Sequence, residues 1–154
     1  MRLSELLAED VIKVEMESRD KEEAFEELMA LLVRSGKVKD PQRAMAAILS
    51  REQLQSTGIG RGLGIPHGKD ASIGCLSCAL GLSHEGIEYD SLDGEPVRVV
   101  FMVLAEKGNP GPHIEALSQI AKLFMMEGFL ERLLKARTAK EVRQVFADCE
   151  ETED

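Results

Sequence analysis

Tryptophan is absent from this chain of 154 residues, and its aromatic residues are one tyrosine and five phenylalanines. Aromatic residues make up only 4% of the sequence, so leucine, isoleucine, valine and methionine must fill the core. Hydrophobic residues still reach 44% and charged residues 31%, which is typical of a globular protein and not of a disordered or fibrous one. The length fits one domain of ordinary size.

Long apolar runs are also missing. The longest, from Val99 to Ala105, is about a third of the roughly 20 residues that a helix needs to cross a bilayer. The first ten residues place acidic side chains where a secretory signal would continue its apolar region. We therefore expect a cytoplasmic protein without membrane insertion.

Positive charge is in short supply. Lysine and arginine number 19 against 28 aspartates and glutamates, which gives a formal net charge of −9. Phosphate contacts to a nucleic acid would have to overcome this general repulsion, so we expect no nucleic-acid partner. The charge favours instead a partner protein with a basic docking face.

Cysteine is scarce as well, with three residues, an odd number that does not form a disulfide framework. Cys75 and Cys78 form a C-x-x-C pattern inside a predicted strand, where residues three apart point to opposite faces. Their sulfur atoms could not share a metal or a disulfide there, so we interpret both as buried core cysteines. The three histidines and Cys149 lack the paired spacing of zinc ligands, so no metal site is expected.

Hydrophobic periodicity and capping residues predict an alternation of strands and helices. Asp20 and Asp40 are expected N-caps, and Gly36 is an expected helix stop. The expected elements are, in order, a strand at 11–16, a helix from 20 to 36, a helix from 40 to 53, a strand and turn at 58–68, strands at 75–82 and 97–104, and helices starting next to residue 113, at 129 and after 138. The pattern predicts an α/β single-domain sandwich at 1–148, with a mixed β-sheet flanked by α-helices on both faces. Residues 149–154 are expected to form a solvated acidic tail.

Glycine is concentrated between Gly58 and Gly68, which raises the question of a nucleotide site. No glycine there begins a G-x-G-x-x-G motif, because the sixth position is Leu63 or Ile65. A P-loop also fails, since Asp70 stands where serine or threonine would bind magnesium. We expect no nucleotide cofactor.

His67 is the strongest candidate for chemistry. Pro66 before it restricts the backbone, and Gly68 after it removes a side chain that would shield the imidazole. A phosphohistidine needs a neutral ring with one nitrogen held by an acceptor and the other free to attack phosphorus. The alternative is a histidine that only satisfies its own turn, which is the commoner role of a lone loop histidine.

Cationic or N–H donors would then have to surround the phosphoryl oxygens. Arg51 near a helix end, Arg61 in the glycine-rich segment and His113 beside a helix N-terminus are the candidates for this phosphoryl-stabilising role. Each has a simpler alternative: Arg51 can counter a helix dipole, Arg61 can be a solvated strand residue and His113 can cap its helix. His84 is expected to be an exposed loop residue.

Glu52, followed after six residues by the run from Ile59 to Gly68, resembles the phosphorylation-site signature of the fructose/mannitol-type EIIA domains (EIIA type 2) of the bacterial sugar phosphotransferase system. Gly64 stands where that family usually has alanine. The resemblance continues through Asp93–Val97 and His113–Leu117, and therefore covers nearly the whole chain.

The resemblance implies that His67 is phosphorylated by an HPr-like phosphocarrier protein, with Arg51 and His113 at the phosphoryl group and no cofactor. The role of Arg61 does not come from the family. Two branches remain open, a sugar-transport EIIA that passes the phosphoryl group to an EIIB cysteine and a nitrogen-regulatory EIIA that signals to a target protein. The residue sequences of Ser56–Gly60 and Pro66–Lys69 favour the regulatory branch. A domain that binds partners without being phosphorylated is a third alternative.

Overall fold

Buried apolar residues line the two long central strands of a six-stranded sheet in the structure, a computed structural model that describes residues 1–153. Every residue of the second long strand from Val99 to Ala105 is buried. The strands are β1 (Ile12–Lys13), β2 (Gly58–Gly60), β3 (Leu63–Gly64), β4 (His67–Asp70), β5 (Ser77–Ile87) and β6 (Val97–Glu106). Pairing is antiparallel between β5 and β6 and between β2 and β3, and parallel elsewhere, which confirms the predicted mixed sheet.

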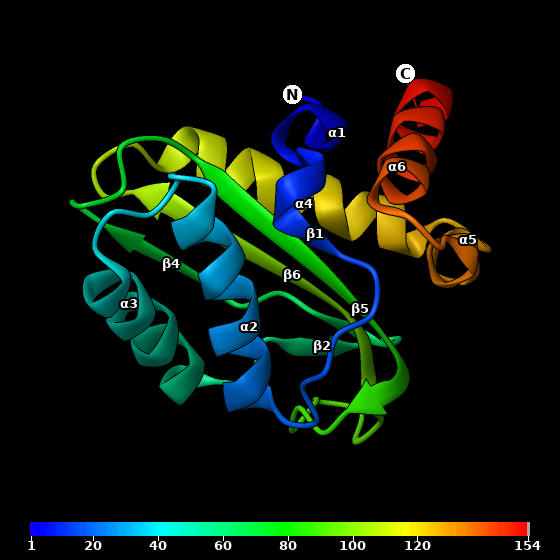
Figure 1. The fold of residues 1–154 in the computed structure, drawn as a ribbon, viewed down its shortest axis with the longest axis horizontal. Helices are drawn as coiled ribbons and strands as arrows, with labels where there is room; N and C mark the ends of the chain where they lie inside the picture. Colours follow the sequence, from blue (N-terminus) through cyan, green and yellow to red (C-terminus); the bar gives the residue numbers. More distant parts are fainter. Residues whose placement is uncertain (154) are drawn as a thin grey trace.

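Helices cover both faces of the sheet, as the sequence predicts. Figure 1 shows α2 and α3 in front of the sheet and α4 behind it. The helices are α1 (Leu3–Leu6), α2 (Lys21–Arg34), α3 (Pro41–Leu54), α4 (Pro110–Met125), α5 (Phe129–Lys135) and α6 (Ala139–Glu153), with a 3-10 turn at Glu9–Val11. The predicted N-caps are confirmed, because the carboxylates of Asp20 and Asp40 accept bonds from the backbone N–H groups of Glu23 and Arg43.

Strands β3 and β4 behave as one strand with a break at Ile65 and Pro66. Leu63 pairs with Val99 and His67 with Val103, so the register against β6 has the same offset before and after the break. Proline has no N–H to donate, which explains the interruption. The Pro66 carbonyl still accepts the N–H of Val103 at 2.9 Å. His67 is therefore fixed in register on a strand that pairs with β6 alone among the described strands.

Two glycines of this segment are required by close packing. A Cβ atom at Gly64 would lie 2.8 Å from the Tyr89 ring, and one at Gly68 would lie 2.9 Å from the backbone of Ala47 in α3. Because side chains alternate along a strand, His67 points to the opposite face from both glycines, toward α4. The strand face on which Gly64 and Gly68 lie has no side chains of its own there, and Tyr89 and helix α3 pack against it.

The structure corrects several boundaries. Helix α1 was not predicted, β1 covers only Ile12–Lys13 of the expected 11–16, and β5 continues past residue 82 to Ile87. The region 58–68 forms a β-hairpin followed by β4 instead of one strand and a turn. His84 is exposed as expected but lies on β5, where its Nε2 contacts the Leu134 carbonyl at 2.8 Å.

The predicted solvated tail is also wrong for its first residues. Helix α6 continues to Glu153, and both Cys149 and Glu150 are buried. The Glu150 carboxylate accepts the backbone N–H groups of Leu3 and Ser4 at 2.6 and 3.0 Å, so the chain's two ends are joined. This contact spans almost the whole sequence, and for that reason no local pattern indicates it.

The two cysteines of the C-x-x-C pattern differ in burial. Cys78 is buried in β5 as expected, but Cys75 is exposed in the turn before that strand. The prediction of two core cysteines was therefore wrong for Cys75, because the strand begins two residues later than expected.

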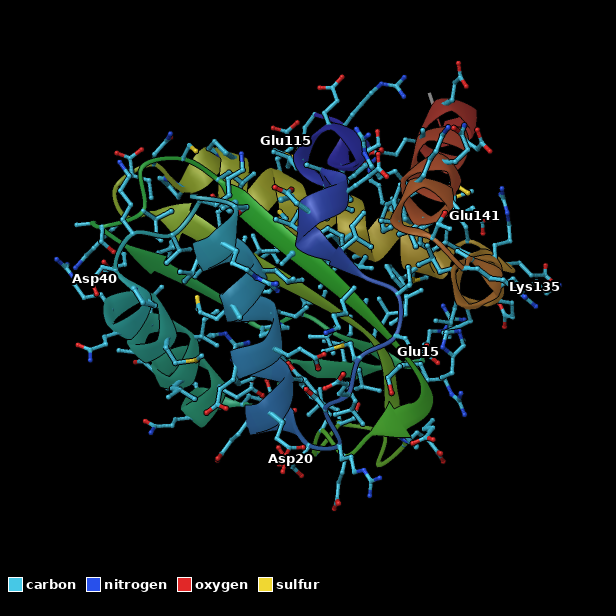
Figure 2. The ribbon with its side chains drawn as sticks, viewed as in Figure 1. Glu15, Asp20, Asp40, Glu115, Lys135 and Glu141 are labelled. Carbon is cyan, nitrogen blue, oxygen red and sulfur yellow. The ribbon has the colours of Figure 1, made fainter. Side chains whose placement is uncertain are left out.

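Charged side chains cover the outside of the molecule. Figure 2 labels Glu115, Lys135 and Glu141, three exposed charged residues on three different helices. Within residues 1–153, no helix is both long and apolar enough to span a bilayer.

Candidate functional site

The imidazole of His67 is half-buried at the start of β4. Its Nδ1 atom lies 2.8 Å from the carbonyl oxygen of Ile65, two residues earlier in the chain. A carbonyl can only accept a hydrogen bond, so Nδ1 carries the proton in the neutral ring. The lone pair is therefore on Nε2, which makes Nε2 the nucleophilic nitrogen.

His113 faces His67 from the first turn of α4. The centroids of the two rings are 5.4 Å apart, and the rings are tilted by 53°. His113 is 5% exposed, and its Nδ1 has no hydrogen-bond partner within residues 1–153. Burial, followed by the charges of His67 and Lys69, lowers the pKa of His113 to about 4, so the ring is neutral at pH 7.

Two cations lie around this histidine pair. Arg51, in the last turn of α3, donates from Nη1 to the carbonyl of Gln55 at 2.8 Å, so it does cap its helix end. It is also close enough for its charge to lower the pKa of His67. Lys69 follows His67 by two residues on β4, which places both side chains on the same face of the strand. The Lys69 charge lowers the pKa of both His67 and His113.

Lys69 is a candidate site residue that the sequence analysis did not include. The signal was available, because strand alternation relates residues 67 and 69 once the segment is known to be a strand. The expected strand and turn ended at Gly68, which placed Lys69 outside the pattern.

Arg61 is not brought to His67. It occupies the turn between β2 and β3 with φ 60°, and its backbone N–H donates to Asp93. The carbonyl of the next residue, Gly62, pairs with Val99, whereas His67 pairs with Val103. Four residues of strand separate these points by roughly 13 Å. This placement argues against the predicted role of Arg61 at the phosphoryl group.

The pKa of His67 itself is lowered, mainly because burial penalises the charged ring. The hydrogen bond to Ile65 and the carboxylate of Glu52 act in the opposite direction, whereas Arg51 and Lys69 reinforce the lowering. A neutral imidazole with a free Nε2 lone pair beside two cations can attack an electrophile that carries negative charge. No group of three or more metal-ligating side chains occurs in the described part of the chain.

Residues 5–149 match the family model described as the phosphoenolpyruvate-dependent sugar phosphotransferase system, EIIA 2. The chain belongs to the EIIA type 2 family. As an EIIA type 2 domain it is a phosphoryl-carrier component of the phosphotransferase system.

Two fructose-specific components are among its curated relatives. The chain is 43% identical over 138 residues to the PTS system fructose-specific EIIABC component of Bacillus subtilis, with 90% of this chain covered but only 22% of that protein. It is 35% identical over 142 residues to the PTS system fructose-specific EIIA component of Haloferax volcanii, where 92% of each chain is covered. The mannitol-specific phosphotransferase enzyme IIA component of Staphylococcus aureus is 37% identical over 96% of this chain and 99% of its own.

The fold is shared with a regulatory protein as well. The nitrogen regulatory protein IIA-Ntr of Neisseria meningitidis superimposes with a TM-score of 0.86 and 33% identity, over 94% of this chain and 98% of that one. Domains with sugar-specific names and a domain with a regulatory name thus share one architecture, so the fold does not distinguish the two roles.

Proposed function

We propose that Nε2 of His67 accepts a phosphoryl group from an HPr-like phosphocarrier protein. The Nε2 lone pair forms the new N–P bond while the bond between phosphorus and the donor's leaving atom breaks, with the two atoms in line. The Ile65 carbonyl keeps the proton on Nδ1, so His67 needs no general base before the attack. The single observation that carries the proposal is this hydrogen bond, which leaves Nε2 unprotonated.

The transferred group is stabilised by the surrounding donors. Arg51 and Lys69 provide positive charge for the phosphoryl oxygens. His113, which is neutral in the free protein, contributes a ring N–H as a hydrogen-bond donor, and the negative charge of the phosphoryl group favours its protonation. Lys69 takes the place that the sequence assigned to Arg61.

The acceptor of the phosphoryl group is proposed to be a cysteine of an EIIB domain from a fructose- or mannitol-type system. Curated relatives with 35–43% identity carry fructose- and mannitol-specific names. In the Bacillus protein the matching region is part of a longer EIIABC chain. The phosphoryl group would pass from Nε2 to the cysteine sulfur, with the N–P bond breaking as the S–P bond forms.

The regulatory branch is the second candidate, supported by the IIA-Ntr structure. In that case the phosphorylated and free forms of His67 would bind a target protein differently, and no onward transfer would be needed. The residue sequences of Ser56–Gly60 and Pro66–Lys69 favour this branch, whereas the names of the curated relatives favour transport.

Docking is proposed to involve apolar side chains next to the site. Leu54, the last residue of α3, is 82% exposed, and Ile114, next to His113, is 62% exposed. Each lies within one helical turn of a residue of the phosphoryl site. An apolar surface beside a charged site fits a protein donor, because the docking residues then position the site for a reaction that the charges assist.

The test is incubation of the protein with phosphoenolpyruvate, enzyme I and HPr, followed by intact-mass measurement. We expect an acid-labile gain of one phosphoryl group in the wild-type protein and none in His67→Ala. Phosphorylation of His67→Ala would overturn the assignment. An unphosphorylated wild-type protein that still binds HPr would favour the partner-binding alternative.

To separate the two branches, the phosphorylated protein is mixed with the EIIB domain of a fructose or mannitol system from the same organism. Transport predicts rapid loss of the phosphoryl group from His67 and its appearance on an EIIB cysteine. Retention on His67, with the same EIIB accepting phosphate from its own EIIA, would reject the transport proposal in favour of regulation.

A further inference from the structure

A buried carboxylate on α3 is close enough to His67 for its charge to act on that ring. Glu52 follows Arg51 in α3, and its side chain is only 7% exposed. Its two oxygens accept the Thr57 backbone N–H at 2.8 Å and the Thr57 hydroxyl at 2.6 Å, and pair with Lys21 Nζ at 2.9 Å. A buried charge is tolerated when it is paired and hydrogen-bonded in this way. The contacts therefore hold residue 57 in one orientation.

Residue 57 is connected to His67 through the backbone of Ile65. The Thr57 carbonyl accepts the N–H of Ile65 at 3.0 Å, and the Ile65 carbonyl accepts Nδ1–H of His67 at 2.8 Å. Ile65 is thus bonded to Thr57 through its N–H and to the ring of His67 through its carbonyl. A shift of Thr57 would therefore move the Ile65 carbonyl, which is the group that keeps the proton of the His67 ring on Nδ1.

Tyr89 supports Thr57 from a second direction. Its hydroxyl lies 2.8 Å from Thr57 Oγ1. The single proton of that threonine hydroxyl is given to Glu52, so Tyr89 must be the donor in this contact. Burial and the nearby Glu52 charge raise the pKa of Tyr89, which keeps the phenol protonated and able to donate.

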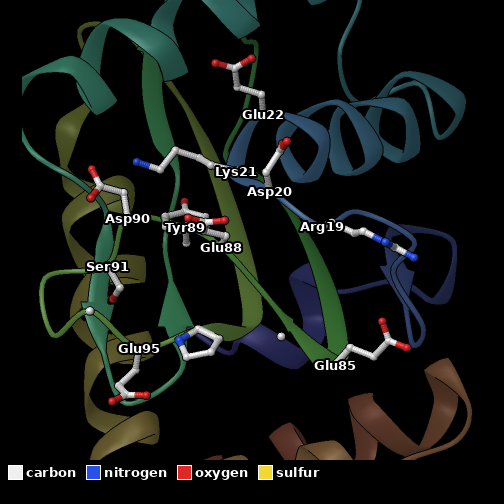
Figure 3. Close-up of a pocket in the computed structure, with 13 residues that line it drawn as sticks. Arg19, Asp20, Lys21, Glu22, Glu85, Glu88, Tyr89, Asp90, Ser91 and Glu95 are labelled. Carbon is white, nitrogen blue, oxygen red and sulfur yellow. The ribbon is translucent and has the colours of Figure 1, made fainter.

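Lys21 and Tyr89 also contact each other at the wall of a surface pocket of about 950 Å³. Figure 3 shows Lys21 extended beside Tyr89, and its Nζ lies 5.1 Å from the centroid of the Tyr89 ring. The ammonium thus satisfies the Glu52 carboxylate and contacts the ring face, a combination that restricts both partners. The tyrosine ring in turn occupies the space that Gly58 and Gly64 leave open.

We propose that Glu52 is a positioning residue for His67, which acts through Thr57 and Ile65 and is held in place by Lys21 and Tyr89. Its role is to keep the Ile65 carbonyl aimed at Nδ1–H, so that the lone pair of the ring stays on Nε2. This proposal rests on the proposed function, in which Nε2 is the atom that is phosphorylated.

The charge of Glu52 acts in the same direction as its hydrogen bonds. Glu52 and the Ile65 carbonyl both raise the pKa of His67, against the lowering by burial, Arg51 and Lys69. Glu52→Gln removes the negative charge and offers one acceptor and one donor where three donors now converge. The bonds from Thr57 and Lys21 cannot all be kept, so we expect the Ile65 carbonyl to shift away from His67. The loss of the Glu52 charge and the weaker bond to Ile65 both lower the pKa of His67. The weaker bond also allows the proton of the neutral ring to occupy Nε2 as well as Nδ1.

Glu27 provides a matched control. It accepts the N–H and hydroxyl of Ser18 and pairs with Lys13 Nζ at 3.3 Å, with a side chain that is 14% exposed. Glu27→Gln is therefore the same chemical change in a similar set of bonds. The charge of Glu27 is absent from the influences on the pKa of His67.

The experiment measures the ring ¹⁵N shifts of His67 against pH in the unphosphorylated protein, and then the rate of phosphorylation by HPr. In Glu52→Gln we expect a mixed tautomer, a lower pKa of His67 and a rate at least about tenfold slower, with the KM for HPr unchanged. In Glu27→Gln we expect the wild-type spectrum and rate. A folded Glu52→Gln protein with the wild-type tautomer and pKa of His67 overturns the proposal.

If Glu52→Gln does not fold, Lys21→Met and Tyr89→Phe give the decisive result. Each removes one support of the cluster, so the ring ¹⁵N shifts of His67 are expected to show a mixed tautomer, to a smaller extent than in Glu52→Gln. An unchanged spectrum in both variants overturns the proposal. Failure of the proposed function looks different, because the wild-type protein would then show the Nδ1–H tautomer but no phosphorylation of His67.

Discussion

The two histidines of the site differ in what fixes their protons. His67 has an acceptor, the Ile65 carbonyl, and therefore one defined tautomer. His113 is more deeply buried, has a low pKa and lacks a partner at Nδ1 within the described residues. A buried nitrogen without a partner costs free energy. A phosphoryl group on the neighbouring ring would bring negative charge to His113, which would favour the protonated ring.

Phosphorylation should continue to a lower pH than a free histidine would allow. The neutral form of His67 is the nucleophile, and burial lowers its pKa below the ordinary value of 6.5. The reactive form therefore dominates at pH 6.5 and is lost only as the pH falls through the lowered pKa. Transfer rates from saturating phosphorylated HPr between pH 5 and 8, beside an NMR titration of His67, measure this. A midpoint at or above 6.5 would contradict the expected direction.

Arg51 and Lys69 should matter for transfer, whereas Arg61 should not. Arg51→Gln and Lys69→Gln each remove a charge that acts on His67, so we expect phosphorylation by HPr to slow by about 10 to 100-fold. Arg61→Gln removes an equal charge from an exposed turn and serves as the control, with a rate within about twofold of wild type. Equal losses in all three variants would indicate a general effect of net charge on docking.

At the scale of elements, the packing of Tyr89 against β3 explains a departure from the family. The signature usually has alanine where this chain has Gly64, and an added Cβ would lie 2.8 Å from the Tyr89 ring. The large side chain on one segment and the missing side chain on the other are therefore complementary. The ring that fills this space is the same one that supports Thr57.

Gly64→Ala should destabilise this chain, although it restores the family's usual residue. Overpacking against a fully buried ring typically costs about 1–3 kcal/mol in the free energy of unfolding. Gly74→Ala is the matched control, because a Cβ atom there meets nothing within 4 Å. Urea unfolding of both variants measures the difference. A Gly64→Ala protein as stable as Gly74→Ala would show that Tyr89 moves at little cost.

Docking should depend on one end of α4 and not on the other. Ile114 and Met125 are 62% and 70% exposed, and they lie roughly 16 Å apart along the helix. Ile114→Lys places a charge beside the site, so we expect the KM for HPr to rise several-fold with little change in stability. Met125→Lys should leave phosphorylation unchanged. If both variants raise the KM equally, the surface beside His113 is not the docking site.

Local signals predicted the elements well where local bonds determine them. The carboxylates of Asp20 and Asp40 cap their helices within three residues, and the apolar runs of β5 and β6 are continuous. Helix α1 could not be predicted in this way, because four residues do not form a stable helix without long-range partners. The short strands β3 and β4 likewise depend on β6, whose paired residues Val99 and Val103 lie 36 positions after Leu63 and His67.

The candidate site was predicted in part for the same reason. His67 and its neighbours Pro66 and Gly68 are a local pattern, whereas the approach of His113 depends on α4 crossing behind β6. Arg61 was chosen by closeness in sequence, which the hairpin and the break at Pro66 make a poor guide. The position of Lys69 beside His67 follows from strand alternation, which applies only once residues 67 to 70 are known to form a strand.

For the whole molecule, the contact between the two ends of the chain is a strong expected contribution to stability. Glu150→Ala leaves the buried N–H groups of Leu3 and Ser4 without an acceptor, and we expect a loss of about 2–3 kcal/mol. Glu151→Ala, at an exposed position on the next residue, should change the free energy of unfolding by less than about 0.5 kcal/mol. Urea unfolding distinguishes them, and equal small effects would show that α1 contributes little.

The strand that carries His67 has a further consequence for how the protein meets its partners. An edge strand with free backbone groups invites another chain to add a strand, which leads to aggregation or to complexes that dissociate slowly. Here β4 is four residues long, follows a proline and carries Lys69, three features that oppose strand addition. We therefore expect partners to bind through side chains, in complexes that separate after each encounter. A carrier that visits donor and acceptor in turn depends on this ease of release.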